Sequence, residues 1–298
     1  MAEPLQIVDP HIHLWDLATG IYPHFEKPSK GRNGSNAAIC RTYGLEEFLD
    51  EGEGEFEIVG AVHIEAFPTD PIRESERLQE IADGSAVPIV LVGNSDLTAP
   101  GFARLLDRHA AFPIFRGIRQ VVNRHANPAL NYVARDFMDD PNFLDGLRLL
   151  GQRGFSFDLQ LYPHQMDQAA SLAAKAPETR FILNHAGMWA DRGLAGWEAY
   201  KKGLRALAAQ PNIVAKISGI GMLDPKWTVE SMRPIVLETL SAFGVNRSMF
   251  ASNFPVDKLY SDFPEVWRAF STIADGFSAD ERAALFRDNA RKAYRIPG

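Results

Sequence analysis

The stretch VDPHIHLWD, from Val8 to Asp16, follows an apolar run that begins near Leu5. An apolar run that leads into His-x-His predicts a β-strand that ends in polar residues. Side chains two residues apart on a strand point to the same face, so His11 and His13 are expected to project together. Two neutral imidazoles in this arrangement are able to share a divalent cation or one substrate oxygen.

The length and the charge of the chain limit the classes of protein to which it can belong. Its 298 residues suit two small domains or one α/β barrel. Hydrophobic residues make up 46% and charged residues 23%, as in an ordinary globular protein. With 31 basic and 38 acidic residues, a net charge of −7 and no basic tract, we expect no nucleic-acid partner.

The cysteine count and the N-terminus bear on location. Cys40 is the only cysteine, so the chain cannot form an intrachain disulfide, which suits a reducing cytosol. The first residues show no basic segment followed by an apolar one, as a signal peptide would. No apolar run approaches the length of a membrane span. We therefore expect a cytoplasmic protein without a membrane partner, and assembly into a homo-oligomer stays open.

Short apolar runs alternate with longer amphipathic segments along the chain. The sequence predicts strands at residues 5–13, 58–65, 88–93, 114–119, 155–161, 180–185, 213–218 and 248–253. It predicts helices at residues 72–82, 102–109, 140–150, 166–176, 197–209, 230–243, 263–274 and 279–293. Strands and helices in alternation predict an α/β fold with a parallel sheet. Eight such units predict a single (β/α)₈ TIM barrel domain over residues 1–298.

An open, doubly wound parallel sheet is the alternative fold. It is disfavoured because no Gly-x-Gly-x-x-Gly motif follows the first strand. Residues 17–39 form a long stretch rich in Gly, Pro, Ser and Asn, which contains Tyr22, His24 and Phe25. Long loops of this kind are often functional, so this one is expected either to cover a substrate or to pack on the surface.

Polar side chains stand at or near the ends of the predicted strands, mostly two residues apart. Besides His11 and His13, the polar set consists of His63, Glu65, Arg116, Arg119, Asp158, Gln160, His185, Lys216, Asn253 and, soon after, Asp257. The active site of a (β/α)₈ barrel lies at the C-terminal ends of its strands. Because buried polar groups need partners, we expect one common polar pocket there.

Structural roles are the alternative for some of these residues. Asp158 and Lys216 could instead form an ion pair inside the barrel mouth. His63 could support a neighbouring group and make no direct contact with a ligand. His109 and His125 lie outside the strand-end pattern and are expected at the surface.

Five motifs together resemble the amidohydrolase superfamily, and more narrowly the amidohydrolase-2 group of sugar-lactone and 2-pyrone-4,6-dicarboxylate lactonases. They are DPHIHLWD at residues 9–16, GIR at 117–119, FDLQ at 157–160, NHAG at 184–187 and FASNFPV at 250–256. The resemblance runs nearly from end to end. It implies a (β/α)₈ hydrolase in which water attacks the carbonyl of an ester or lactone.

The resemblance also implies roles for single residues. His11, His13 and His185 match positions that bind a divalent metal, for which zinc or manganese is expected. In metal-free members these positions contact the substrate carbonyl directly. Glu65 matches an acidic position found in parts of the group.

The remaining polar residues are expected to bind the substrate. Arg116 and Arg119 are suited to hold an anionic part of it, because guanidinium groups pair well with carboxylates and other oxyanions. Of the two arginines, Arg119 is expected to face the pocket. The further predicted substrate contacts are His63, Asp158, Gln160 and Lys216.

One position departs from the family pattern. Where relatives usually have an Asp that orients and deprotonates the attacking water, this chain has Asn253. An Asn side chain has no basic carboxylate. Asp257, Glu65 and His13 are the candidates for the general base, and a metal-bound water would need a weaker base. Asp257 is expected either to return over the barrel mouth or to point to solvent.

The sequence therefore predicts a hydrolase that opens a small lactone or cyclic ester, with an anionic or polyhydroxylated small molecule as substrate. One alternative is a decarboxylase of a small acid in the same superfamily. The other is a barrel that binds a metabolite without converting it, which Asn253 favours.

Overall fold

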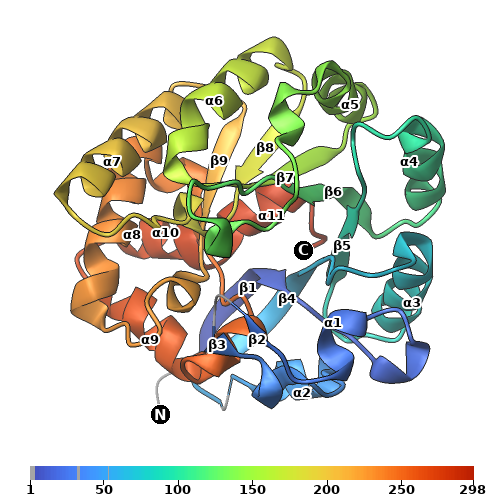
Figure 1. Cartoon of the computed structure of the whole chain (residues 1–298). Helices are drawn as coiled ribbons and strands as arrows, with labels where there is room; N and C mark the ends of the chain where they lie inside the picture. Colours follow the sequence, from blue (N-terminus) through green and yellow to red (C-terminus); the bar gives the residue numbers. More distant parts are fainter. Residues whose placement is uncertain (1–3, 32–33, 53) are drawn as a thin grey trace.

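The computed structural model describes residues 4–31, 34–52 and 54–298. Eight of its strands form one parallel sheet in chain order. These strands are β1 (Leu5–Ile12), β4 (Phe56–Ile64), β5 (Ile89–Asn94), β6 (Phe115–Val121), β7 (Ser156–Gln160), β8 (Arg180–Leu183), β9 (Ile213–Ile217) and β10 (Ser248–Phe250). Figure 1 shows the strands at the centre of the molecule and the helices around them. The predicted (β/α)₈ barrel is confirmed.

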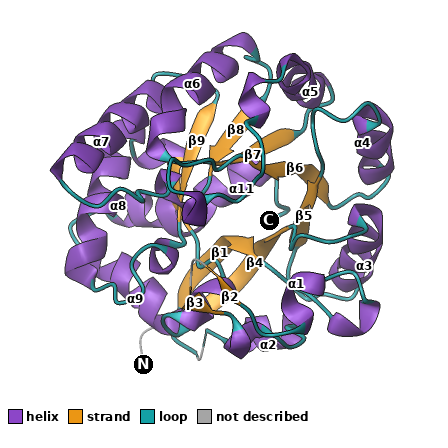
Figure 2. Cartoon of the chain, viewed as in Figure 1, coloured by secondary structure: helices purple, strands orange, loops and turns teal. Residues whose placement is uncertain are grey.

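The outer layer of the barrel, as Figure 2 shows, is formed by helices α3 (Pro71–Asp83), α4 (Phe102–Ala110), α5 (Pro141–Gln152), α6 (Met166–Lys175), α7 (Leu194–Ala208), α8 (Val229–Phe243) and α9 (Phe263–Ile273). Helices α10 (Ala279–Ala283) and α11 (Asn289–Tyr294) follow, and α11 lies across one end of the barrel. The segment after β1 carries the short helices α1 (Pro23–Glu26) and α2 (Leu45–Asp50) and a hairpin of β2 (Lys30–Gly31) and β3 (Gly34–Ser35). Among the described residues no helix is long and apolar enough to cross a membrane.

Local sequence signals set the starts of two outer helices. The side chain of Asp70 accepts hydrogen bonds from the backbone N–H groups of Ile72 and Arg73, and a proline occupies the first turn of α3. Asp140 caps α5 in the same way. An acidic N-cap pairs with backbone N–H groups that have no partner inside the helix, and proline has no N–H to satisfy there.

The barrel closes where the end of β10 meets β1. The N–H of Asn253 donates to the carbonyl of His11 over 2.9 Å, and the N–H of His13 donates to the carbonyl of Phe254 over 2.8 Å. Asp9 Oδ1 accepts from the backbone N–H groups of His11 and Ser252 at 3.2 and 3.1 Å. Burial raises the pKa of Asp9 to about 7. These bonds join the His-x-His strand to the Asn253 segment.

The segment predicted as one helix over residues 279–293 is instead interrupted. Helices α10 and α11 flank a π-helical turn at Ala284–Asp288. A π turn places an extra residue in one turn of helix and so shifts the face that follows. Leu285 and Phe286 in this turn are fully buried. The helical pattern therefore predicted the segment correctly but missed the irregular turn that packs it against the barrel.

His109 is buried, so the expectation that it lies at the surface is wrong. It follows Phe102 and Leu106 on the buried face of α4. Its ring stacks on Phe115 with the centroids 5.0 Å apart, and its Nε2 lies 3.2 Å from the Asn94 carbonyl oxygen. A histidine with both an apolar neighbour and a buried acceptor packs well in a core.

Candidate active site

Three histidines from two distant segments meet at the C-terminal end of the barrel. His11 is the penultimate residue of β1, His13 follows the strand, and His185 is the second residue after β8. The ring centroids of His11 and His185 are 4.5 Å apart, and those of His11 and His13 are 5.0 Å apart. The structure thus brings together the three histidines that the sequence paired.

Hydrogen bonds set the orientation of two of these rings. His13 Nδ1 lies 2.7 Å from the carbonyl oxygen of Ile64. A carbonyl oxygen can only accept, so Nδ1 carries the proton and Nε2 keeps its lone pair. His185 Nδ1 lies 2.9 Å from Ser218 Oγ. Both ring nitrogens of His11 are buried without a hydrogen-bond partner among the described residues.

The three imidazoles are neutral at physiological pH. Burial lowers the pKa of each ring well below its usual value. The positive charge of Arg119 adds to this effect at His13 and His185. A neutral imidazole whose free nitrogen faces a ligand is able to accept a proton.

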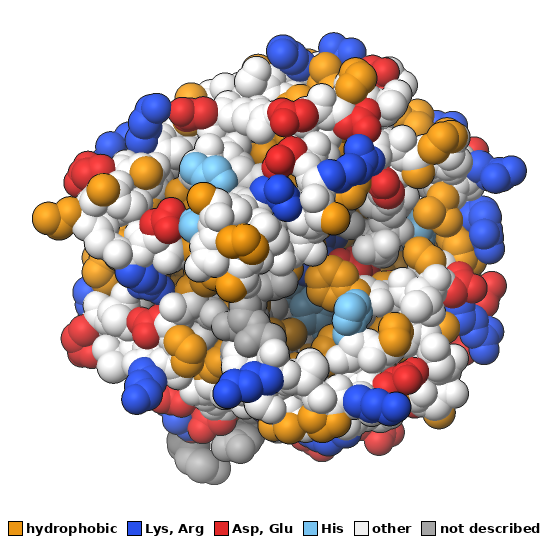
Figure 3. Space-filling model, in the orientation of Figure 1, with side chains coloured by type: hydrophobic (Ala, Val, Ile, Leu, Met, Phe, Trp, Pro, Cys, Tyr) orange, Lys and Arg blue, Asp and Glu red, His pale blue; other side chains and the backbone are white. Residues whose placement is uncertain are grey.

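A cavity of about 420 Å³ opens above the histidines. Figure 3 shows it as a hollow in this face of the molecule, with histidine and hydrophobic side chains at its walls. Its lining residues are His13, His24, Phe25, Ser29, Gly34, Asn36, Ile39, Ala66, Phe67, Arg119, Tyr132, Gln160, His185, Met222, Asn253, Val256 and Leu259. The segment over residues 17–39 therefore contributes to the cavity wall.

Arg119 lies at the cavity floor in a dense ion pair with Glu65. Its Nε donates to Glu65 Oε1 over 2.7 Å, and its Nη2 donates to the Glu65 carbonyl over 2.7 Å. Glu65 Oε2 accepts from Asn94 Nδ2 at 3.0 Å and from the N–H of Phe67 at 2.7 Å. Both carboxylate oxygens of Glu65 are thus engaged. Glu65 holds the guanidinium in place and is not free to act as a base.

Gln160 lies beside this pair and also lines the cavity. Its Oε1 lies 3.3 Å from Arg119 Nη1, a long hydrogen bond. Because this weak contact is the only one that Nη1 makes to the described residues, Nη1 is the part of the guanidinium best placed to bind a substrate oxygen.

Asn253 lines the cavity, whereas Asp257 does not. Asp257 is 3% exposed and packs against Gly221, where an added Cβ would lie 2.6 Å from Asp257 Oδ1. Burial raises the pKa of Asp257 to about 8, although hydrogen bonding from Asn253 acts to lower it. Asp257 therefore points neither over the mouth nor to solvent. Its protonated carboxyl is not a base at neutral pH.

Asp158 and Lys216 lie beneath the cavity floor. Lys216 Nζ bonds Asp158 Oδ1 at 2.8 Å, the carbonyl of Pro10 at 3.0 Å and Tyr294 Oη at 2.6 Å. Both side chains are fully buried and neither lines the cavity. We therefore assign them to an interior ion pair and not to the substrate, the structural alternative noted above.

His63 and Arg116 also lie away from the cavity. His63 Nδ1 accepts from the N–H of Leu14 at 3.0 Å, and its Nε2 lies 3.4 Å from Glu74 Oε1. Arg116 stands near the start of β6, where its Nη1 donates to the carbonyls of Pro113 and Phe115 at 2.7 and 2.9 Å. Neither side chain is placed to touch a substrate. The sequence predicted the strand over residues 114–119, whereas β6 continues to Val121, so Arg116 stands at the start of the strand and not at its end.

Unusual backbone conformations collect around the cavity. Five of the six non-glycine residues with positive φ among the described residues are Phe67, His185, Ala186, Met188 and Asn253. Such conformations cost energy and persist where the surrounding structure holds them, often at functional sites. Phe67 and Met222 line the cavity and were missed by the sequence reasoning. The signal that could have found them is their position shortly after the second and seventh of the predicted strands.

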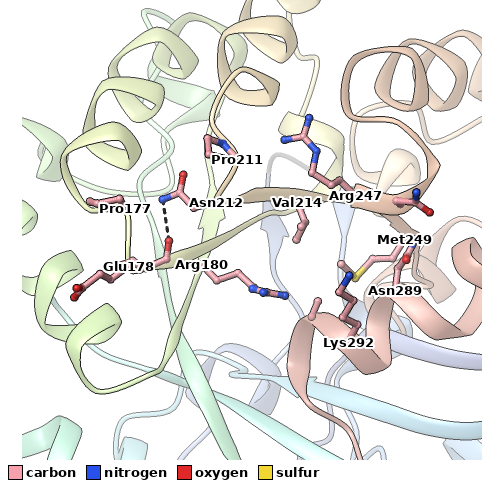
Figure 4. A pocket seen from close by; sticks show the side chains of 13 residues that line it. Pro177, Glu178, Arg180, Pro211, Asn212, Val214, Arg247, Met249, Asn289 and Lys292 are labelled. Carbon is pink, nitrogen blue, oxygen red and sulfur yellow. Dashed lines mark hydrogen bonds between the residues drawn. The ribbon is translucent and has the colours of Figure 1, made fainter.

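A second cavity, of about 360 Å³, lies at the opposite end of the barrel (Figure 4). Three of its polar side chains donate to backbone carbonyls. Asn212 Nδ2 donates to the Thr179 carbonyl over 3.0 Å, Arg247 Nη1 to the Gln210 carbonyl over 3.1 Å, and Asn289 Nδ2 to the Ser248 carbonyl over 2.7 Å. It contains no histidine and faces the end of the barrel that carries no chemistry in this fold.

The match to known proteins agrees with the geometry of the mouth. A family model described as Amidohydrolase matches residues 8–296. The chain belongs to the amidohydrolase family. The predicted resemblance and the prediction of a hydrolase are confirmed.

Individual members of the amidohydrolase family differ in how closely they match. The chain is 44% identical over 298 residues to "Uncharacterized protein y4mH" of Sinorhizobium fredii, covering 98% of this chain and 99% of that one. It is 29% identical over 239 residues to L-fucono-1,5-lactonase of Burkholderia multivorans, covering 75% and 77%. The crystal structure of an amidohydrolase from Burkholderia multivorans with bound zinc matches with a TM-score of 0.80 at 26% identity, covering 98% and 100%.

The zinc in that relative raises the question whether these residues fit a divalent cation. The two partnerless ring nitrogens of His11 would suit one. The rest of the site does not. No three His, Cys, Asp or Glu side chains in the described part of the chain are grouped to hold an ion. Asn253 brings no negative charge, and the nearby carboxylates of Glu65 and Asp158 are already engaged in ion pairs with Arg119 and Lys216. The residues as placed do not fit a metal, so we derive no step through one.

Proposed function

We propose that this amidohydrolase opens a small lactone or cyclic ester by attack of water on the carbonyl carbon. The observation that carries the proposal is the bond from His13 Nδ1 to the Ile64 carbonyl. It leaves the lone pair of Nε2 on a side chain that lines the cavity, beside His185 and Arg119. A base, a polar group for the carbonyl and a cation for a developing oxyanion thus lie together on the floor of the cavity.

Each group has a separate role in the proposed reaction. His13 Nε2 takes a proton from water while the water oxygen bonds to the carbonyl carbon. Arg119 Nη1 and His185 stabilise the negative oxygen of the tetrahedral intermediate. The ring C–O bond then breaks, His13 returns the proton to the leaving alkoxide, and the product is a hydroxy acid. Water and lactone are the only reactants, so the atoms balance.

The lactonase names of relatives support the same reaction class. L-fucono-1,5-lactonase at 29% identity is one of them. These names do not identify the substrate of this chain, for which the side chains that line the cavity are the relevant observation.

The test is a panel of lactones given to the purified protein, with acid release followed at constant pH and the metal content measured beside it. We expect hydrolysis of at least one lactone, and we expect a chelator such as EDTA to leave the rate unchanged. A rate that disappears on chelation and returns with zinc or manganese would show that His11, His13 and His185 act through a metal instead.

A barrel that binds without turnover is the second candidate, and Asn253 is the observation that favours it. Tight binding of a lactone without release of acid, in both the parent protein and an Asn253→Asp variant, would establish it. Release of carbon dioxide from small carboxylic acids in the same assay would identify a decarboxylase.

A further inference from the structure

The cavity is divided into a polar floor and a mainly apolar wall. The floor carries His13, Arg119, Gln160, His185 and Asn253. The wall and rim carry the apolar side chains of Phe25, Ile39, Ala66, Phe67, Met222, Val256 and Leu259. The polar lining residues outside the floor are His24, Ser29, Asn36 and Tyr132. Polar groups at one end and apolar groups at the other predict a ligand with the same division.

Phe67 is the most exposed part of this wall. It is 39% exposed, although most large hydrophobic side chains of the protein are buried. Its backbone has a φ of 54°, and its N–H donates to Glu65 Oε2 over 2.7 Å. The Phe67 ring lies 5.2 Å from the Arg119 guanidinium carbon. The ring is therefore fixed next to the cation that binds the substrate, in a backbone conformation that carries strain.

Phe25 provides a second fixed aromatic surface. Its ring stacks on Trp15 with centroids 3.8 Å apart and planes 6° apart. Trp15 is 1% exposed, and its Nε1 donates to the carbonyl of Arg41 over 2.6 Å. An aromatic wall that is already ordered loses little side-chain entropy when a ligand binds.

The apolar side chains of the wall offer no partner for a hydroxyl group, so outside the floor such partners are limited to four polar lining residues. Asn36 is already engaged, because its Oδ1 accepts from the N–H of Ser29 at 2.6 Å and its Nδ2 donates to the carbonyl of His24 at 3.2 Å. A hydroxyl that leaves water for an apolar surface without a new hydrogen bond costs about 1–3 kcal/mol. A lactone with a hydroxyl on every ring carbon would bear this cost several times.

We propose that the substrate is a small lactone with an apolar ring face, aromatic or alkyl, that packs on Phe67 and Phe25 while its carbonyl end lies on the polar floor. This inference rests on the proposed lactonase function. It makes Phe67 a specificity-determining residue.

The test compares dihydrocoumarin, a lactone with an aromatic face, with D-glucono-1,5-lactone, which is hydroxylated around the ring. Spontaneous hydrolysis of each is subtracted. We expect kcat/KM to be at least about tenfold higher for dihydrocoumarin. Phe67→Asn keeps a residue type that tolerates positive φ and should lower kcat/KM for dihydrocoumarin about tenfold, a larger loss than for the hydroxylated lactone. The matched control is Leu237→Asn on α8, where Leu237 is 40% exposed and lies outside the cavity.

Equal or faster hydrolysis of the hydroxylated lactone, with Phe67→Asn and Leu237→Asn behaving alike, would overturn the inference but leave the lactonase intact. If neither compound is hydrolysed, the same pair is tested for binding by calorimetry. Preferential binding of dihydrocoumarin that is lost in Phe67→Asn would then support the apolar face although the hydrolase proposal had failed. Equal binding of the two lactones, or no binding of either, would contradict both the apolar-face inference and the hydrolase proposal.

Discussion

Arg116 and Arg119 lie on the same strand, yet their side chains serve opposite ends of the barrel. Arg119 is 2% exposed and lines the cavity, held by Glu65, whereas Arg116 donates to backbone carbonyls near the start of β6. Gly117 lies between them, where an added Cβ would come within 2.4 Å of the Ser156 carbonyl oxygen. The two residues are of the same type, so their positions along β6 decide that Arg119 and not Arg116 faces the cavity.

We predict that Arg119→Met raises KM for an anionic or carbonyl substrate by about 10- to 100-fold. The loss of one charged hydrogen bond costs about 1.5–3 kcal/mol, which corresponds to that factor. Steady-state kinetics measure it, and Arg116→Met is the control that should keep the parent KM. Equal effects of the two substitutions would contradict the assignment of Arg119 to the substrate.

His13 and Asp257 form a second pair of contrasting residues. We predict that His13→Gln lowers kcat by about 10²–10⁴, the usual loss for a general base. Asp257→Asn should keep kcat within about threefold, because burial raises the pKa of Asp257 to about 8 and an amide replaces a neutral acid of the same shape. Single-turnover and steady-state rates check both. A large loss of kcat in Asp257→Asn but not in His13→Gln would show that Asp257, and not His13, is the general base.

At the scale of elements, α11 closes the lower end of the barrel interior. Its last residue, Tyr294, donates to Asp158 Oδ1 over 2.7 Å and lies 2.6 Å from Lys216 Nζ. Asp158 comes from β7 and Lys216 from β9, so one hydroxyl connects a helix to two strands. This contact ties the C-terminal helix to the layer directly below the histidines.

We predict that Tyr294→Phe lowers the free energy of unfolding by about 1.5–3 kcal/mol, since it leaves charged groups with a lost hydrogen bond in the interior. Tyr200→Phe is the matched control. In the described part of the chain its buried hydroxyl meets only Thr239 Oγ1, at 3.2 Å, so the loss of this hydroxyl should cost about 0.5–1.5 kcal/mol. Urea unfolding curves measure both values. A cost for Tyr294→Phe that is no larger than the control would show that the ion pair does not depend on α11.

At the scale of the whole molecule, buried titratable groups connect folding to pH. Burial lowers the pKa of His109 in the folded protein, while the unfolded chain has the ordinary value near 6.5. The contribution of the neutral ring to stability is complete above that value. This contribution is lost as the pH falls below the pKa of the unfolded chain, because the unfolded chain takes up the proton first.

We predict that His109→Phe is less stable than the parent at pH 8 and that the difference shrinks at pH 5. The substitution removes the hydrogen bonds to Ser75 and Asn94 but also removes the titrating group. Unfolding free energies of both proteins at the two pH values provide the measurement. A difference that stays constant or grows at pH 5 would show that His109 does not carry this linkage.

Much of the site could be predicted from the sequence because parallel strands place their C-terminal ends at one mouth. The polar residues that follow β1, β4 and β8, and Arg119 near the end of β6, therefore meet there. Their partners could not be predicted in the same way. The pairing of Glu65, after β4, with Arg119, on β6, spans the intervening strand β5. This pairing, and that of Asp158 with Lys216 across the interior, depend on strand register and burial.

The sequence by itself determined the alternation of strands and helices, the barrel and the convergence of His11, His13 and His185, because two- and 3.6-residue periods and strand polarity are local properties of the chain. Only the tertiary structure decided which carboxylates keep a charge and which side chains reach the cavity. Asp257 shows the reason. Its pKa of about 8 arises because segments distant in the sequence bury it away from water. The residue type alone does not show whether a carboxylate is hydrated or buried.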